Sequence, residues 1–400
     1  MVTVFVAFFI AVLVFRLILT DCDGKYAMVL LNGFVLRLLV MLIDYFQIIE
    51  IPFSNNDAQG FHEVAVANQN SYYGYSTNYT VFLTGLYYVT DCARWFAQYV
   101  NVVFGVLLLI YLRKILFLLD VDEKKRKYVL IIASYMPFPI IYSALLLREA
   151  WVSFFVILSL YYFVRWYLSC GKNGVSIFLT MLSVIFALLM HEGCIGLVFG
   201  YIFAFLFYNR KENRIRLSAS TYIAFFLLSV IGVIFILNLN IFLEKFAGAL
   251  EDPGEALQAK NAGEGGGADY LTWIDFSNPF NILLFAPLKI IYFLFSPIIT
   301  DWRGLNDIIA FLLDSLIYIY VFWIVIKGTT TMENRLLKKF VLITLSATIL
   351  IFSFGTTNSG TAIRHRSKLL AVVLVVYAMS SYSGEPSKKL ENKNLPLLEN

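Results

Sequence analysis

Long apolar runs separated by short polar segments dominate the chain. Most runs are about 15 to 25 residues long, which is of the order needed to cross a ~30 Å hydrocarbon core as a helix. The pattern therefore predicts an all-α fold, a polytopic transmembrane helix bundle of about eleven spans. The predicted spans are residues 4–19, 27–48, 99–119, 128–147, 151–168, 175–190, 194–208, 218–242, 308–326, 340–354 and 369–381.

Composition agrees with this pattern and excludes an ordinary soluble protein. The 400 residues are 60% hydrophobic and 14% charged, whereas a soluble domain has about 25% charged residues. The net charge of +4 is too small to indicate nucleic acid as a partner. The four cysteines have no paired spacing typical of zinc or disulfide frameworks. Residues 1–20 lack the features of a cleaved signal peptide, so we interpret them as a retained first span.

Basic residues orient the predicted bundle, because cytoplasmic loops carry an excess of lysine and arginine. All four basic clusters fall on one side if residues 283–299 lie in the interface or re-enter instead of spanning. This places the N-terminus outside, the C-terminus inside, and residues 383–400 in a cytoplasmic polar tail after a bundle of residues 1–382. The clusters are residues 124–127, then Arg210, Lys211, Arg214 and Arg216, then Lys327, Arg335, Lys338 and Lys339, then Lys388, Lys389 and Lys393.

Two long segments, about 50–98 and 244–302, are left on the outer side. The first is rich in tyrosine, which favours helices at the headgroup level. The second contains the glycine-rich residues 263–267, which predict a flexible loop. Two such loops suit an enzyme working at the outer membrane face better than a channel or carrier.

Four polar sites at the outer ends of spans are candidates for chemistry, because charge at a membrane is costly and often functional. In the first, Asp57 and His62 share a helix face if a helix begins at Asn55 or Asn56. A helix cap followed by a solvated loop is the alternative. In the second, Arg148 presents a guanidinium suited to phosphate, or it reaches the interface and pairs with its neighbour Glu149.

The third site is the turn His191-Glu192-Gly193, which is either functional or a helix cap with a surface ion pair. The fourth is the basic segment 364–368, which runs against the charge rule on the outer side and therefore favours a phosphate or pyrophosphate ligand. Its residues are Arg364, His365, Arg366, Ser367 and Lys368. All three histidines of the chain are thus predicted on the outer side. Arg37 and Asp44, two helical turns apart within a span, are expected to brace the bundle.

Familiar catalytic templates are absent from the sequence. It has no phosphate-binding P-loop and no dinucleotide glycine fingerprint. It also lacks a zinc-binding His-Glu-x-x-His helix and a Gly-x-Ser-x-Gly elbow. No internal repeat supports an inverted-repeat transporter.

The polar motifs resemble those of the GT-C superfamily, multi-span glycosyltransferases that use polyprenyl-linked sugar donors. The matching segments are Asn56-Asp57-Ala58 with Phe61-His62 and Ala65, the run Pro137 to Trp151, the turn 187–192, and the segment 364–368 before the last span. Segments of this kind also recur in Wzy-type O-antigen and capsule polymerases. Two spans precede the acidic loop and no large C-terminal outer domain follows, and both departures favour a polymerase.

The resemblance implies a polymerase of the bacterial inner membrane, joining undecaprenyl-pyrophosphate-linked repeat units at the periplasmic face. The implied partners are this lipid-linked oligosaccharide, the lipid bilayer, a chain-length regulator and a flippase. Asp57, or His191 with Glu192, would be the general base. No cofactor is required, and a divalent metal stays undecided. The pyrophosphate would be bound by Arg148, Arg364, Arg366 and Lys368, with His62 and His365 near the acceptor.

Two other functions remain open from the sequence. One is a glycosyltransferase that adds a single sugar from a polyprenyl monophosphate. The other, from a different class, is a transporter or flippase of lipid-linked oligosaccharide, which needs basic pockets but no general base.

Overall fold

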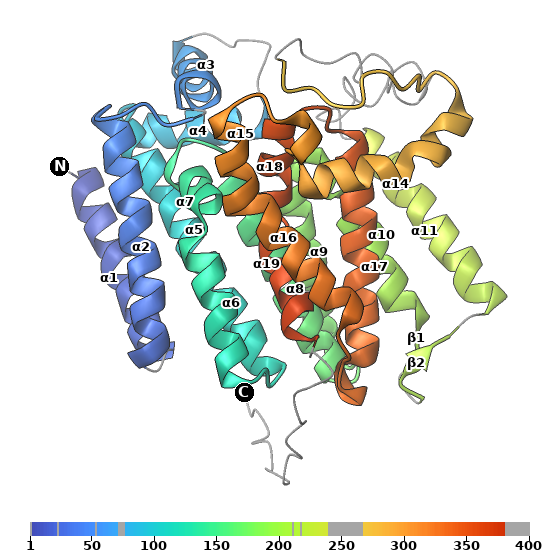
Figure 1. The fold of residues 1–400 in the computed structure, drawn as a ribbon. Coiled ribbons are helices and arrows are strands. Elements are labelled where there is room, and N and C mark those ends of the chain that lie inside the picture. Colours follow the sequence, from blue (N-terminus) through green and yellow to red (C-terminus); the bar gives the residue numbers. More distant parts are fainter. Residues whose placement is uncertain are drawn as a thin grey trace.

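The computed structural model is a helical bundle with one two-stranded hairpin (Figure 1). It describes residues 2–21, 24–52, 54–70, 77–209, 212–216, 218–238 and 267–380. The hairpin pairs β1 (Tyr208–Asn209) antiparallel with β2 (Arg214–Ile215). The predicted all-α class is therefore confirmed. The predicted tail, most of the glycine-rich segment 263–267, and Arg210 with Lys211 lie outside the described residues.

Six helical segments are long and apolar enough to cross a membrane among the residues described. Each follows a predicted run, because an apolar helix satisfies its own backbone groups where water is absent. They are α1 (Val2–Asp21), α2 (Gly24–Tyr45), α5 (Arg94–Leu118), α8 (Glu149–Leu168), the segment Leu305–Lys327 and α17 (Met332–Phe354). Leu305–Lys327 is itself built from α15 (Leu305–Ala310), the π-helical turn η4 (Phe311–Ser315) and α16 (Leu316–Lys327).

The other predicted spans also coincide with helices, of which α11 (Ala219–Asn238) has 20 residues and the others are shorter or bent. A seventh span is formed if α6 (Glu123–Tyr135) and α7 (Pro137–Ala144), bent by 50°, are taken together. The predicted positions of the helices are thus confirmed, whereas the count of eleven spans stays a prediction. The remaining helices of this group are α9 (Gly174–Met190), α10 (Ile195–Phe207), α11 (Ala219–Asn238) and α19 (Leu370–Ala378).

The bend between α6 and α7 has a clear cause in the sequence. Pro137 has no backbone N–H, so the carbonyl of Ala133 loses its helical donor. Arg37 of α2 supplies the replacement: its Nη2 lies 3.4 Å from Ala133 O, and its Nη1 lies 3.4 Å from Ser134 O. Its Nε donates to Ser143 Oγ at 2.9 Å. Arg37 therefore braces the bundle, as expected, by holding a broken helix.

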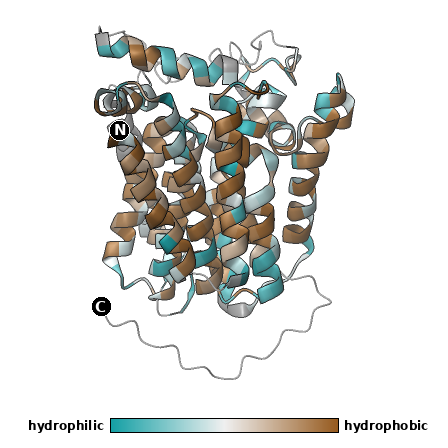
Figure 2. Ribbon diagram, turned by 90° about the vertical axis from the view of Figure 1, so that its left-hand side faces the viewer, coloured by the Kyte–Doolittle hydropathy of each residue, from teal (hydrophilic) through white to brown (hydrophobic). Residues whose placement is uncertain are grey.

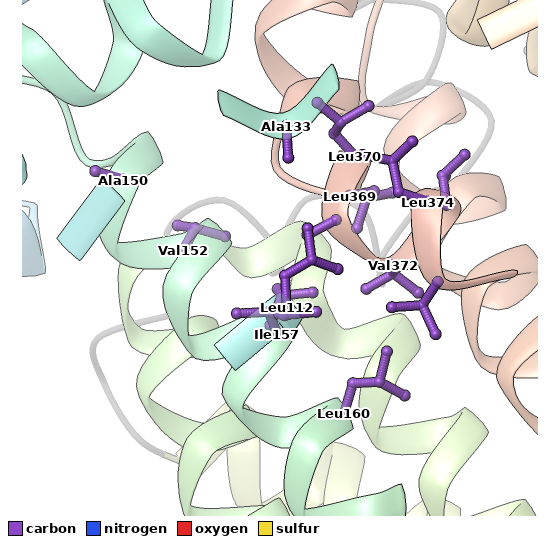
Figure 3. Close-up of a cluster of buried hydrophobic side chains, with 14 of the residues drawn as sticks. Leu112, Ala133, Ala150, Val152, Ile157, Leu160, Leu369, Leu370, Val372 and Leu374 are labelled. Atoms are coloured by element: carbon purple, nitrogen blue, oxygen red, sulfur yellow. The ribbon is translucent and has the colours of Figure 1, made fainter. Parts of the chain in front are cut away.

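The last described helix, α19, lies in the centre of the bundle. All nine of its residues are buried, and it contacts α5, α6, α8, α16 and α17. Figure 3 shows Leu370, Val372 and Leu374 beside Leu112 of α5 and Leu160 of α8. A helix that is apolar on every side can lie in a protein core or face lipid, and its packing here shows that α19 lies in the core.

The two ends of the bundle are both polar but carry different elements. Figure 2 shows apolar residues through the middle of the bundle and polar residues at both ends. In Figure 1 the hairpin and the N-terminal end of α6, with residues 124–127, lie at the lower end. The upper end carries α14 (Pro279–Phe295), which runs across it instead of along the bundle. With α14 lie α3 (Gln59–Asn70), α4 (Asn78–Thr90), α15 and α18 (Ser359–Ser367).

Candidate functional site

Four segments far apart in sequence bring the candidate residues together at the upper end of the bundle (Figure 1). They are the π-helical turn η1 (Ser54–Ala58), the start of α8, the turn η2 (Glu192–Cys194) with His191, and α18. Arg148 and Glu149 of the second site, Arg364 and Lys368 of the fourth, and Asp57 of the first form one charged cluster. The third site adjoins it through His191.

Arg364 is the centre of this charged cluster. Its Nε donates to Glu149 Oε1 at 2.7 Å, and its Nη1 donates to Asp57 Oδ2. The two carboxylates differ in exposure, since the side chain of Asp57 is 42% exposed and that of Glu149 only 2%. Burial alone would lower the pKa of Arg364, but the carboxylates of Glu149 and Asp57 raise it above its ordinary value. Arg364 is therefore a permanent cation between a buried and an accessible carboxylate.

Glu149 holds a second cation inside the protein. Lys368 Nζ lies 3.3 Å from Glu149 Oε1, and the lysine side chain is fully buried. Burial lowers the pKa of Lys368 to about 7, against the opposing influence of Glu149. The other carboxylate oxygen of Glu149, Oε2, is buried without a hydrogen-bond partner in the described part of the chain. Glu149 thus ties the start of α8 to both ends of the segment 364–368.

The segment that leads into α8 is held by a buried asparagine. Asn101 Nδ2 donates to the carbonyls of Leu145 at 2.7 Å and Leu147 at 2.8 Å, and its Oδ1 accepts from Trp151 Nε1 at 2.7 Å. These bonds satisfy carbonyls that the gap between α7 and α8 leaves without helical donors. They fix the backbone immediately before Arg148.

Arg148 stands beside the cluster with an unused donor. Its Nε is buried and has no hydrogen-bond partner among the described residues. Burial lowers its pKa, while the nearby carboxylates of Glu149, Glu192 and Asp57 oppose that shift. Arg148 therefore shares the electrostatic environment of Arg364 without forming the surface pair with Glu149 that the sequence left as an alternative.

His191 and His365 face each other across the turn. Their Nε2 atoms lie 3.3 Å apart. His191 Nδ1 accepts from the Gly193 N–H at 3.1 Å, and His365 Nδ1 lies 3.0 Å from Thr356 Oγ1, whose hydroxyl donates to Phe352 O at 2.7 Å. These partners assign the protons: His191 carries one on Nε2 and donates it to His365, which carries one on Nδ1 for Thr356.

This histidine pair has consequences for the choice of general base. The accepting nitrogen of His191 is already occupied by the Gly193 N–H, so it has no free lone pair for a substrate proton. Burial lowers the pKa of His191 well below its usual value, and the charge of Lys368 acts in the same direction. Close packing keeps the turn in place, because a Cβ on Gly193 would lie 2.7 Å from Phe352 Cε1. Asp57 is therefore the more accessible of the two candidates for the general base.

Arg366 does not join the cluster, and the predicted pyrophosphate role for it needs revision. Its guanidinium is fully buried against Asp314, with Nε 2.6 Å from Asp314 Oδ2. Its Nη2 donates to Ser315 Oγ at 2.9 Å, and its Nη1 donates to Phe293 O at 3.2 Å. All three nitrogens are thus engaged inside the bundle, and we assign Arg366 a structural role. An acidic residue inside an apolar span, Asp314, was the sequence signal for this partner.

His62 also lies apart, in a separate polar group between α3, α4 and α5. Its Nδ1 is 2.8 Å from Tyr87 Oη. Burial lowers the pKa of His62, and the charge of Arg94 lowers it further. Asp44 binds Arg94 at 3.4 Å and Gln98 at 2.6 Å. Asp44 therefore braces the bundle as expected, but with partners other than Arg37.

A metal site is not evident in the described part of the chain, where no three His, Cys, Asp or Glu side chains are grouped as metal ligands. Comparisons with protein-family models, with curated proteins and with solved structures found no match.

Proposed function

We propose that the protein is a membrane glycosyltransferase, a surface-polysaccharide polymerase that joins undecaprenyl-pyrophosphate-linked repeat units. The observation that carries the proposal is Arg364, shared between Asp57 and Glu149 at the bundle end opposite residues 124–127. A guanidinium and an accessible carboxylate side by side suit a reaction that needs a charged leaving group and a proton acceptor. The charge rule supports an orientation in which this end faces away from the cytoplasm, which in the proposed bacterial inner membrane is the periplasmic side.

The proposed step assigns one task to each group. Asp57 removes the proton from the acceptor hydroxyl. The acceptor oxygen bonds to the anomeric carbon while the bond from that carbon to the pyrophosphate oxygen breaks. Arg148, Arg364 and Lys368 stabilise the charge that develops on the departing undecaprenyl pyrophosphate. Glu149 positions Arg364 and Lys368, and the histidine pair fixes the neighbouring turn.

Chain extension by the full-length protein in membranes tests this proposal. With a lipid-linked repeat unit as substrate, Asp57→Asn should slow extension on the order of 10²–10⁴-fold, and Arg364→Ala should abolish the long products on a gel. Arg303 and Asp307 provide matched controls, since they form a separate ion pair at the same end, with Nη2 and Oδ1 2.7 Å apart. Arg303→Ala and Asp307→Asn should leave extension unchanged.

The products also separate the competing functions. A ladder of products supports the polymerase, whereas one added sugar with a polyprenyl-monophosphate donor would identify a single-sugar transferase. Normal extension by Asp57→Asn and Arg364→Ala, at normal protein levels, would contradict an enzymatic role for the cluster. The transporter would then be the better explanation.

A further inference from the structure

The formal charges around Arg364 balance without any ligand. The cations Arg148, Arg364 and Lys368 stand among three carboxylates, those of Asp57, Glu149 and Glu192. A further anion brought into this group would find Arg364 and Lys368 already paired with carboxylates. An anionic ligand can therefore gain Nη1 of Arg364 only if Asp57 leaves it.

We propose that Asp57 occupies, in the ligand-free protein, the place on Arg364 that a diphosphate oxygen takes when ligand binds. Binding of the diphosphate then displaces Asp57 from the guanidinium. This inference rests on the proposed function, because it concerns the same site and the same class of donor. It adds an order of events: the donor binds first, and its binding releases the base.

The burial of the two carboxylates decides which one leaves. Glu149 is held by both Arg364 and Lys368 and is almost completely buried. Removing it would leave two buried cations without a counter-ion, which is costly. Asp57 is 42% exposed, and its contact with Arg364 is its one ion pair among the described residues. The side chain of Asp57 can therefore rotate away from Arg364 toward solvent at a smaller cost in free energy.

The position of Asp57 permits this exchange without unfolding the surrounding structure. The preceding end of η1 is anchored, because Ser54 Oγ donates to the buried Asp44. A change at Asp57 therefore needs only a different side-chain rotamer on a fixed turn. The vacated Nη1 of Arg364 and the unused Nε of Arg148 are then N–H donors available to a diphosphate, and guanidinium groups bind phosphate oxygens well.

Displacement also explains how one carboxylate can serve as a base here. In the ligand-free protein, Asp57 Oδ2 already accepts a hydrogen bond from Arg364 Nη1 and is occupied by it. Once the diphosphate has taken the guanidinium, Asp57 is free and close to the leaving group. The acceptor is then deprotonated only when a donor is present.

The test is pyrophosphate binding by the purified full-length protein in lipid nanodiscs, measured by calorimetry with inorganic pyrophosphate and no sugar. If Asp57 competes with the ligand, Asp57→Asn should bind pyrophosphate ~10- to 100-fold more tightly than the wild type, since the variant no longer offers a charged competitor. Asp307→Asn should bind like the wild type. Arg364→Ala should bind at least ~10-fold more weakly.

Equal or weaker binding by Asp57→Asn would overturn the proposal: equal binding would mean that Asp57 does not compete with the ligand, and weaker binding that Asp57 helps to hold it. Asp57→Ala provides a second variant without the charge, and the unfolding midpoint of each variant checks that it is folded. The outcome is independent of polymerase activity. If Asp57→Asn binds pyrophosphate more tightly but the wild-type protein makes no polymer, the displacement of Asp57 is supported. The proposed polymerase reaction is then rejected.

Discussion

Breaking the buried pair between Arg366 and Asp314 should destabilise the protein strongly. In Asp314→Asn the guanidinium of Arg366 keeps only Ser315 Oγ and Phe293 O as strong partners and loses its counter-ion at 2.6 Å. Both side chains are completely buried. Removing one partner of such a pair typically costs about 3–5 kcal/mol, because the other charge stays uncompensated. We expect a loss of this size in the free energy of unfolding.

Replacing both partners should restore most of that stability. Arg366→Met with Asp314→Leu removes both charges and keeps apolar volume, and exchanges of this kind are often neutral or stabilising. The double variant separates two roles for Arg366. If its role is structural, the double variant regains both stability and chain extension. If Arg366 binds pyrophosphate, stability returns and extension does not.

The assay is denaturant-induced unfolding of the purified protein in detergent, together with chain extension in membranes. Arg303→Met with Asp307→Leu is the matched control, and loss of this more exposed pair should cost at most about 1 kcal/mol. A loss below about 1 kcal/mol in Asp314→Asn would refute the reasoning from burial. A stable but inactive double variant would refute the structural assignment of Arg366.

Three further predictions concern the base, the buried lysine and the topology. His191→Gln should slow extension much less than Asp57→Asn, because the accepting nitrogen of His191 is taken by Gly193; equal losses in initial rate would make His191 the base. The pKa of Lys368 is lowered to about 7 by burial in the folded protein, so the unfolded chain binds more protons between pH 7 and 10.5. The free energy of unfolding should therefore rise with pH across this window and level off above it; Lys368→Met should reduce that rise, and unchanged slopes in unfolding titrations would contradict the shift. Reporter fusions after residue 388 should be active in the cytoplasm and fusions within residues 263–267 in the periplasm; the reverse pattern would invert the proposed orientation.

The helices could be predicted from the sequence because apolar runs alone determine where they form. The number of spans could not, because a run does not show how far its helix extends before a turn. The run at residues 194–208 gives α10, which has 13 residues, and the run at 369–381 gives α19, which has nine. Tertiary packing around α19 makes it a buried central helix, and no property of its own sequence distinguishes that from exposure to lipid.

Most residues of the candidate site could be predicted from the sequence, but the ion pairs that they form could not. Arg364 and Arg366 look equivalent in the sequence, yet two residues on an α-helix point about 200° apart. One therefore faces Asp57 and Glu149, and the other faces Asp314. Glu149 was noted only as a neighbour of Arg148, because a partner 215 positions away leaves no local signal.

The long separation between Glu149 and its partners has a consequence for biogenesis. Glu149 is buried, and Arg364 follows it by 215 residues. At a synthesis rate of about 5–20 residues per second, the ribosome needs roughly 10 to 40 s to produce that partner. During this interval the carboxyl group must stay in contact with water or carry a proton, so α8 cannot settle fully into the bundle. Arrival of α18 and Lys368 supplies both cations at once, so α8 completes its packing only when α18 and α19 have joined the bundle.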